Sequence, residues 1–318
     1  MPTVGDLFDA WLVHVTTRLE VATVISYRSV VRQLRPLVGA RRLDDLTAAE
    51  LDGVYVRLLE AGRSASTVHR HHRAMHAALR QAVRWGWLTA NPADAATPPR
   101  VPRRRIRPPT ASDVVRLIDA ASRSSTPDLA VALRILVATG MRRGELCALR
   151  WRDIDPAAQT LRVEGAMVHG ETGIVEKDTK THAARRLSLD AGTVALLQRH
   201  REECQCRASA RGRSLSPDAF VLANSADGTV PWRPNRLTQA FARLRRQLGL
   251  DGVRLHDLRH FQATELIAAG VDVRTVAGRL GHADAATTLR IYAAFTRPAD
   301  ERAARVVGRL LDPEAGSP

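Results

Sequence analysis

The chain has 318 residues, of which 45% are hydrophobic and 25% charged, and its formal net charge at pH 7 is +15. This length predicts about two domains with buried cores. No apolar run approaches the roughly 18–20 residues that cross a bilayer and no signal peptide is apparent, which predicts a cytoplasmic protein without membrane contact. Three sparse cysteines argue against a disulfide framework, and the excess of base over acid favours a polyanionic partner, most commonly nucleic acid.

Residues 1–96 are predicted to be entirely helical. The periodicity of apolar residues gives four helices, over residues 4–15, 22–38, 48–61 and 66–85. Thr47-Ala-Ala-Glu50 has the pattern of a helix-capping box, and Gly62 and Gly86 stand where two of the helices would end. Four helices within fewer than a hundred residues predict a small helical bundle.

The charge excess is concentrated in residues 63–107, which contain ten arginines and a single acidic residue. On the helix predicted over 66–85, arginines spaced by three, four and seven share much of one face: Arg70, Arg73, Arg80 and Arg84. A basic face with apolar residues behind it suits DNA phosphates, and a merely solvated face is the alternative. His72 and His76 could share a metal, but we expect no metal site because no acidic partner is nearby.

A proline-rich segment, TPPRVPRRRIRPP, follows over residues 97–109. Proline removes backbone donors and keeps the chain extended, so this segment is predicted to be a linker between two domains. Three consecutive arginines lie inside it: Arg103, Arg104 and Arg105. Such a linker can lie along a DNA backbone, although a surface connector that its arginines keep soluble is the alternative.

Residues 110–311 are predicted to form a domain that is mainly α-helical with a small antiparallel β-sheet (an α+β fold), and residues 312–318 a short tail. Thr110 opens its first helix, a second covers 128–139, and a short one follows Gly140. Strands are expected over residues 160–168, 173–177, 185–189 and 219–224. Further helices are expected over residues 190–206, 234–248, 257–269, 272–280, 284–295 and 299–310.

Short stretches of this domain carry groups that can act on a phosphodiester. We find no paired carboxylates for Mg²⁺ and no P-loop, so the bond would have to be broken by Arg, His and Lys side chains with a protein nucleophile. Arg142 follows a glycine turn, and Glu145, three residues later, can brace it. Lys180 lies in a predicted hairpin over Lys177–Arg186, which holds the only two lysines of the chain; a lysine, unlike an arginine, can give up a proton near neutral pH.

The remaining groups are two histidines, an arginine and a tyrosine closer to the C-terminus. His256 and Arg259 are three residues apart and would share one helical face, and His282 precedes Tyr292 by ten residues. Taken singly, each feature has a plainer interpretation: Tyr292 as a core residue, His256 as a buried histidine, and residues 263–281 as a helix-turn-helix. Their occurrence together, in one order, favours a catalytic site.

This ordered set resembles the catalytic domain of the tyrosine recombinases, the phage integrase family. The resemblance runs from about residue 110 to residue 297 and lies in the motifs ATGMRRGELCALRW, KTHAARRLSL, HDLRHFQAT and RLGHADAATTLRIY. Residues 1–96 resemble the helical core-binding domain of such enzymes, and the two domains would then form a C-shaped clamp around DNA. No N-terminal arm-binding domain is evident, as in the simpler Xer type.

The resemblance implies how the site would work. Arg142 and Arg259 would hold the non-bridging oxygens of the scissile phosphate, while Tyr292 would attack the phosphorus and form a 3′-phosphotyrosyl link. Because this link conserves the energy of the phosphodiester, neither a metal, ATP nor another cofactor is expected.

Three further roles follow from the same resemblance. Lys180 would protonate the leaving 5′-oxygen, His256 would act as acid or base, and His282 would hydrogen-bond the phosphate. The expected partner is double-stranded DNA with specific recombination sites, bound by a tetramer of protomers on synapsed DNA, with a role for accessory proteins left open. The alternatives are a nicking-closing enzyme like the type IB topoisomerases and a DNA-binding regulator without catalysis, which the intact residue set disfavours.

Overall fold

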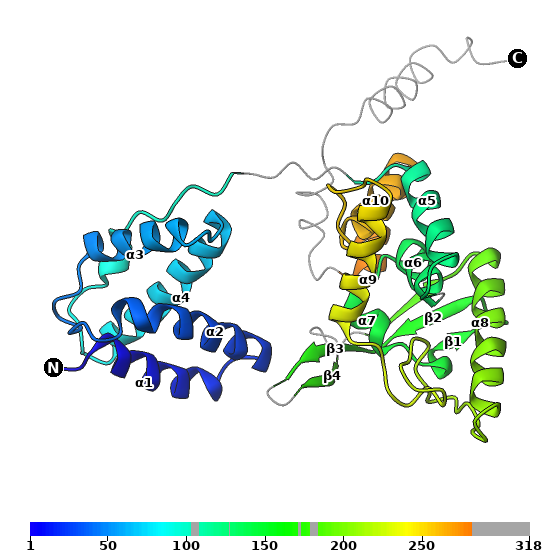
Figure 1. The fold of residues 1–318 in the computed structure, drawn as a ribbon, viewed down its shortest axis with the longest axis horizontal. Helices are drawn as coiled ribbons and strands as arrows, with labels where there is room; N and C mark the ends of the chain where they lie inside the picture. The colour runs from blue at the N-terminus through cyan, green and yellow to red at the C-terminus, as the bar shows by residue number, and fades with distance from the viewer. Residues whose placement is uncertain (103–107, 127, 171–172, 179–183, 282–318) are drawn as a thin grey trace, which may run out of the picture. The chain divides into compact units, whose positions relative to one another are not determined.

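The structure of the protein, a computed structural model, describes residues 1–102, 108–126, 128–170, 173–178 and 184–281. The chain forms two compact units, one built mainly from residues 1–102 and the other mainly from the described residues after 107, and each has its own hydrophobic core (Figure 1). Helices dominate, and short strands occur between residues 154 and 188, so the predicted mainly α-helical fold with a small antiparallel sheet is confirmed. None of the described helices is long and apolar enough to span a membrane.

The N-terminal unit contains four helices and a short 3-10 helix: α1 (Val4–Thr16), α2 (Val21–Val38), α3 (Ala48–Glu60), α4 (Ala65–Arg84) and η1 (Pro92–Asp94). The four helices match the predicted ones to within one residue at each end. Thr47 and Glu50 form the predicted capping box at the start of α3. Gly62 and Gly86 follow α3 and α4 with φ of 75° and 73°, a left-handed conformation that glycine adopts without strain, and so end these helices as expected.

Helix α4 has an apolar face that packs against α1, α2 and α3. The buried side chains of this face are Val68, His71, Ala74, Met75, Ala78, Leu79 and Ala82. Each large apolar side chain buried in this way contributes roughly 1.5–3 kcal/mol relative to an exposed one. The arginines of α4 lie on its exposed side, so the helix is fixed by its apolar face while its basic face stays open to solvent.

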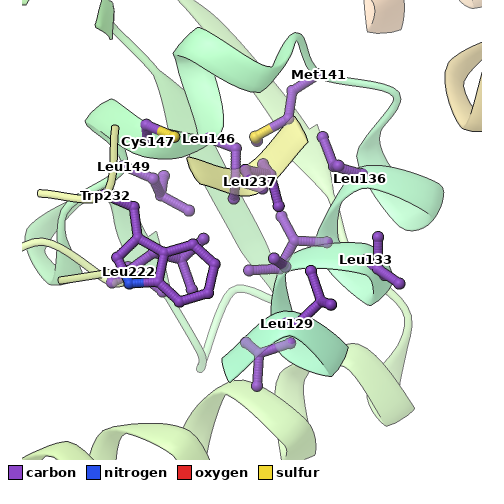
Figure 2. Packing of buried hydrophobic residues seen from close by; sticks show 14 of the residues in the cluster. Leu129, Leu133, Leu136, Met141, Leu146, Cys147, Leu149, Leu222, Trp232 and Leu237 are labelled. Carbon is purple, nitrogen blue, oxygen red and sulfur yellow. The ribbon is translucent and has the colours of Figure 1, made fainter. Parts of the chain in front are cut away.

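The second unit opens with α5 (Ala111–Ser122), α6 (Asp128–Thr139) and α7 (Arg143–Ala148), as predicted from Thr110, residues 128–139 and Gly140. After the strands come α8 (Ala191–Ser209), α9 (Pro234–Gln247), α10 (Asp257–Ala268) and α11 (Val273–Leu280). Helix α6 is buried at the centre and contacts α5, α7, α8, α9 and α10. Figure 2 shows Leu129, Leu133 and Leu136 of α6 in one cluster with Leu146 of α7 and Trp232.

The strands form two separate small sheets. Strands β1 (Ile154–Asp155), β2 (Thr160–Val163) and β5 (Arg185–Ser188) pair in the order β1-β2-β5, with Leu161 opposite Leu187, both buried. Strands β3 (Gly165–His169) and β4 (Ile174–Asp178) pair with each other. The predicted hairpin over Lys177–Arg186 is therefore wrong, because β4 pairs with β3 while β5 pairs with β2.

Two of the predicted strands need correction. The strand expected over residues 160–168 is divided into β2 and β3, because after Val163 the chain leaves the first sheet and its backbone passes close to Gly144 of α7. Residues 219–224 do not form a strand. Their backbone bonds alternate between the Leu149–Trp151 segment on one side and residues 228–232 on the other, which leaves only isolated bridges.

Candidate active site

The loop between α6 and α7 places Arg142, and its shape depends on Gly140. Gly140 has φ of 64°, and a Cβ at this position would collide with the side chains of Gln262 and Leu280. Thr139 is buried and its hydroxyl accepts from the amide of Met141 at 3.3 Å, while Met141 itself is buried in the core. Side chains of α6, α10 and α11 therefore contact this loop and fix its shape.

Arg142 and Glu145 make the contact that their spacing predicted. The backbone amide of Arg142 donates to the Glu145 carboxylate at 2.7 Å, and its guanidinium donates to the same carboxylate at 2.9 Å. Arg142 also donates to the carbonyl oxygen of Gly281 at 3.1 Å. The Glu145 side chain is 3% exposed, whereas that of Arg142 is 49% exposed and can meet a ligand.

Arg259 lies in α10, which packs against α6. Its guanidinium is buried and donates to the carbonyl oxygen of Gly140 at 2.6 Å. Since Gly140 is two residues before Arg142, the two predicted phosphate-binding arginines meet at one loop although 117 positions separate them in the sequence numbering. On the next turn of α10, Gln262 donates to the carbonyl oxygen of Ala138 at 2.8 Å and fixes the same loop.

His256 directly precedes α10 and has helical backbone angles, φ −68° and ψ −22°. His256 and Arg259 are therefore about one helical turn apart, as their spacing predicted. Its ring lies 4.9 Å from that of His260. Partial burial, followed by the positive charges of His260, Arg259 and Arg142, lowers the pKa of His256 to about 4, against a smaller opposing effect of Asp257. The ring is therefore neutral at pH 7, although the residue is open to solvent.

Arg185 also belongs to this site, although its sequence position predicted no role for it. From the start of β5 it donates to both carboxylate oxygens of Glu145, at 2.6 and 3.2 Å, and to the carbonyl oxygen of Arg279 at 3.0 Å. Burial alone would raise the pKa of Glu145, but the hydrogen bonds and charges of Arg185 and Arg142 outweigh it and hold that pKa below its usual range. The sequence contained one signal: Arg185 lies two residues before Leu187 in the predicted strand over 185–189, so it shares the strand face of an apolar residue, where an arginine needs an acidic partner.

The other predicted catalytic residues, Lys180, His282 and Tyr292, lie outside the described residues. Two described residues border them in the sequence. Asp178 ends β4, two positions before Lys180, and Gly281, which precedes His282, caps α11 with φ of 66°. Arg142 binds the carbonyl oxygen of Gly281, so the site is fixed up to the residue before His282.

In the N-terminal unit, all four arginines of the predicted DNA-binding face are exposed: Arg70, Arg73, Arg80 and Arg84. Among the described residues, none of the four forms an ion pair with a carboxylate, in contrast to Arg35, Arg41 and Arg42 of the same unit. Arg103, Arg104 and Arg105 of the predicted linker lie outside the described residues.

Two histidines of α4 form hydrogen bonds with other elements of this unit. His72 is hydrogen-bonded through Nδ1 to the hydroxyl of Tyr55 at 2.8 Å, and His76 through Nε2 to Asp94 at 2.7 Å. The expectation that no acidic residue lies near His76 is therefore wrong, because the turn at η1 returns Asp94 to α4. Within the described ranges, no three His, Cys, Asp or Glu side chains are grouped as metal ligands.

The model of the phage integrase family matches residues 109–297, more than half of the chain. The chain belongs to the phage integrase family. The predicted resemblance to the tyrosine recombinases is thereby confirmed.

Two relatives of this phage integrase family member are named tyrosine recombinases. A tyrosine recombinase XerC-like protein of Caldanaerobacter subterraneus subsp. tengcongensis is 25% identical, over 91% of this chain and 78% of that protein. The tyrosine recombinase XerC of Roseiflexus sp. is 29% identical, over 91% and 88%. Among solved structures, the Tn1549 transposon integrase in complex with circular intermediate DNA shares the fold with a TM-score of 0.80, at 20% identity, over 96% of this chain and all of that one.

Proposed function

We propose that this chain is a site-specific recombinase of double-stranded DNA that cleaves and rejoins strands through a 3′-phosphotyrosyl link to Tyr292, without metal or ATP. The observation that carries the proposal is the meeting of two arginines at one loop. Arg259 is bonded to Gly140, two residues before Arg142, and Arg142 exposes about half of its side chain. The names of the relatives and the DNA bound to the Tn1549 integrase support the same activity.

The arginines are suited to a phosphate whose charge grows during the reaction. Arg142 and Arg259 would each donate charge-assisted hydrogen bonds to non-bridging oxygens, and these bonds strengthen as the phosphorane forms. The donors are fixed before the substrate arrives, because Glu145 holds Arg142 and Gly140 holds Arg259. Little reorganisation is then needed at the moment of reaction.

The proton transfers complete the proposed mechanism. The phenol of Tyr292, with an ordinary pKa of about 10, loses its proton to the neutral ring of His256 as its oxygen bonds to phosphorus. The bond from phosphorus to the 5′-oxygen breaks, and Lys180 supplies a proton to that oxygen, while His282 hydrogen-bonds the phosphate. Attack by the free 5′-hydroxyl of a second strand reverses these steps and releases the tyrosine.

DNA binding would involve both units. We assign residues 1–96 to a DNA-binding domain, 97–109 to a basic linker, 110–311 to the catalytic domain and 312–318 to a tail. In this proposal both domains contact the DNA, and four protomers act on synapsed sites in the cytoplasm, with accessory proteins where a site requires them. Phosphate contacts come from the exposed arginines of α4 and from those of the linker: Arg70, Arg73, Arg80, Arg84, Arg103, Arg104 and Arg105.

A nicked suicide DNA that carries the recombination site tests the proposal. Wild-type protein should become covalently attached to this DNA in the presence of a chelator, and Tyr292→Phe should not. Tyr27→Phe is the matched control, because Tyr27 packs on Trp11 in the N-terminal unit and should not affect attachment. Adduct formation by Tyr292→Phe, or its loss on chelation, would overturn the assignment.

Assays with other DNA substrates distinguish the alternative activities. A nicking-closing enzyme would relax supercoiled DNA without pairing two sites, whereas a recombinase gives products that join two site-bearing DNAs. A DNA-binding regulator would shift the mobility of the site without any covalent adduct.

A further inference from the structure

One carboxylate in the site is shared by two guanidinium groups. Glu145 accepts from Arg142 at 2.9 Å and from Arg185 at 2.6 and 3.2 Å. The exposures differ sharply: the side chain of Arg142 is 49% exposed, that of Arg185 12% and that of Glu145 3%. Arg142 therefore faces outward to a ligand, while Arg185 faces the carboxylate from within the fold.

The sharing decides the charge of the group. Glu145 is ionised, and two guanidinium charges face its single negative charge, so the three side chains together carry one positive charge. Arg142 alone with Glu145 would be a neutral pair. In a partly buried site, an anion is attracted far more weakly by a neutral pair than by a group with a net positive charge.

Arg185 also joins two elements of the site. Its Nε donates to the carbonyl oxygen of Arg279 in the last turn of α11, and its guanidinium lies beside Gly281, where a Cβ would approach it to 2.7 Å. Arg142 donates to the carbonyl oxygen of the same Gly281. The start of α7 and the end of α11 are thus fixed to one another through Arg142, Glu145 and Arg185.

We infer that Arg185 is a positioning residue for the reaction: by occupying the buried Glu145 carboxylate, it leaves Arg142 with a positive charge available to the scissile phosphate. This inference rests on the proposed function for the role of the phosphate, but the sharing of Glu145 is a property of the described residues alone. Arg185 does not itself reach the substrate, because its side chain is mostly buried.

Second-site rescue tests the inference. Arg185→Gln should leave Arg142 neutralised by Glu145 and slow single-turnover adduct formation on the suicide DNA by roughly 10- to 100-fold. Adding Glu145→Gln to the same protein removes the carboxylate, frees the charge of Arg142 and should recover at least part of the loss. A merely structural role predicts the opposite, since the double variant lacks both partners and should be the slower. Arg185→Lys keeps the cation but loses the paired donation to both oxygens of Glu145, so its rate should lie between those of Arg185→Gln and wild type.

The matched control is Arg186→Gln. Arg186 is the next residue of β5, is exposed on the opposite face and bonds to the hydroxyl of Thr160 at 3.0 Å. It should leave adduct formation unchanged. Unchanged cleavage by Arg185→Gln, or a double variant no faster than Arg185→Gln, would overturn the inference.

A second readout does not depend on catalysis. Inorganic phosphate should raise the melting temperature of wild-type protein more than that of Arg142→Gln, which defines the background from other basic sites. This excess should disappear in Arg185→Gln and return in the double variant. If wild type forms no DNA adduct, the proposed function fails, yet this phosphate comparison still decides whether Arg185 governs the charge of Arg142.

Discussion

The guanidinium of Arg259 donates a hydrogen bond to the carbonyl oxygen of Gly140, 2.6 Å away and 119 residues earlier in the chain. Because Gly140 lies two residues before Arg142, this bond links the two arginines that we propose hold the phosphate. Gly140 presents its carbonyl from a left-handed backbone conformation, with φ of 64°. The backbone of one glycine therefore joins the two halves of the site.

Gly140→Ala should impair both stability and cleavage. The alanine Cβ would collide with Gln262 and Leu280, and its φ would be strained. We expect a loss of about 1–3 kcal/mol in the free energy of unfolding, measured by urea denaturation. Displacement of Arg142 should slow adduct formation by roughly 100-fold. Gly62→Ala is the control, because φ is 75° there but no atom lies within 4 Å of the new Cβ, in the other unit. Equal slowing by both variants would show that strain alone, and not the loop, is responsible.

His256 should titrate well below an ordinary histidine. Its folded-state pKa is about 4, lowered by partial burial and by His260, Arg259 and Arg142, while the unfolded chain titrates near 6.5. As the pH falls from about 7 toward 4, the unfolded state binds a proton first, so this histidine contributes stability above pH 6.5 that is lost on acidification. NMR of the imidazole protons, assigned with His256→Asn, measures the midpoint. A midpoint at or above 6.5 would contradict the neutral ring that we propose as proton acceptor.

The parts of the fold that depend on neighbouring residues were predictable from the sequence. Thr47 and Glu50 are three residues apart, and Gly62 and Gly86 act on the helix that each one follows, so the helix ends could be placed to within a residue. Residues 219–224 were predicted as a strand because their apolar run fits one. Their hydrogen-bond partners lie on two different segments, which a local pattern does not contain.

The contacts of the candidate site are also of two kinds, those between residues close in the sequence and those between distant segments. Arg142 and Glu145 are one helical turn apart, and their ion pair followed from spacing. Arg185 and Glu145 are 40 residues apart, and no periodicity relates β5 to α7, so this pair required the three-dimensional structure. His76 and Asp94 are 18 residues apart and meet only because η1 folds back on α4, which explains the wrong expectation for that histidine.

Charge reversal on α4 should weaken DNA binding. Arg73 and Arg80 are exposed, and neither forms an ion pair with a carboxylate in the described parts of the chain. Arg73→Glu combined with Arg80→Glu should lower the affinity and reduce the slope of log K against log salt by about 2 if each arginine meets one phosphate. Arg28→Glu with Arg32→Glu on α2 changes the net charge equally and serves as the control. The interpretation of a DNA-binding face fails if both pairs of substitutions have the same effect.

Lys180 should act on the leaving group alone. Lys180→Ala is expected to slow attachment to ordinary suicide DNA by roughly 100-fold or more, as loss of a general acid does. A substrate with sulfur in place of the bridging 5′-oxygen leaves as a thiolate and needs no proton, so it should restore the rate of the variant to near that of wild type. Lys177→Ala, in β4, provides the matched control because it removes the other lysine of the chain and should cleave both substrates normally. If the sulfur substrate rescues Lys177→Ala and not Lys180→Ala, the general acid is Lys177, and the alignment of the Lys-Thr motif with Lys180 is wrong.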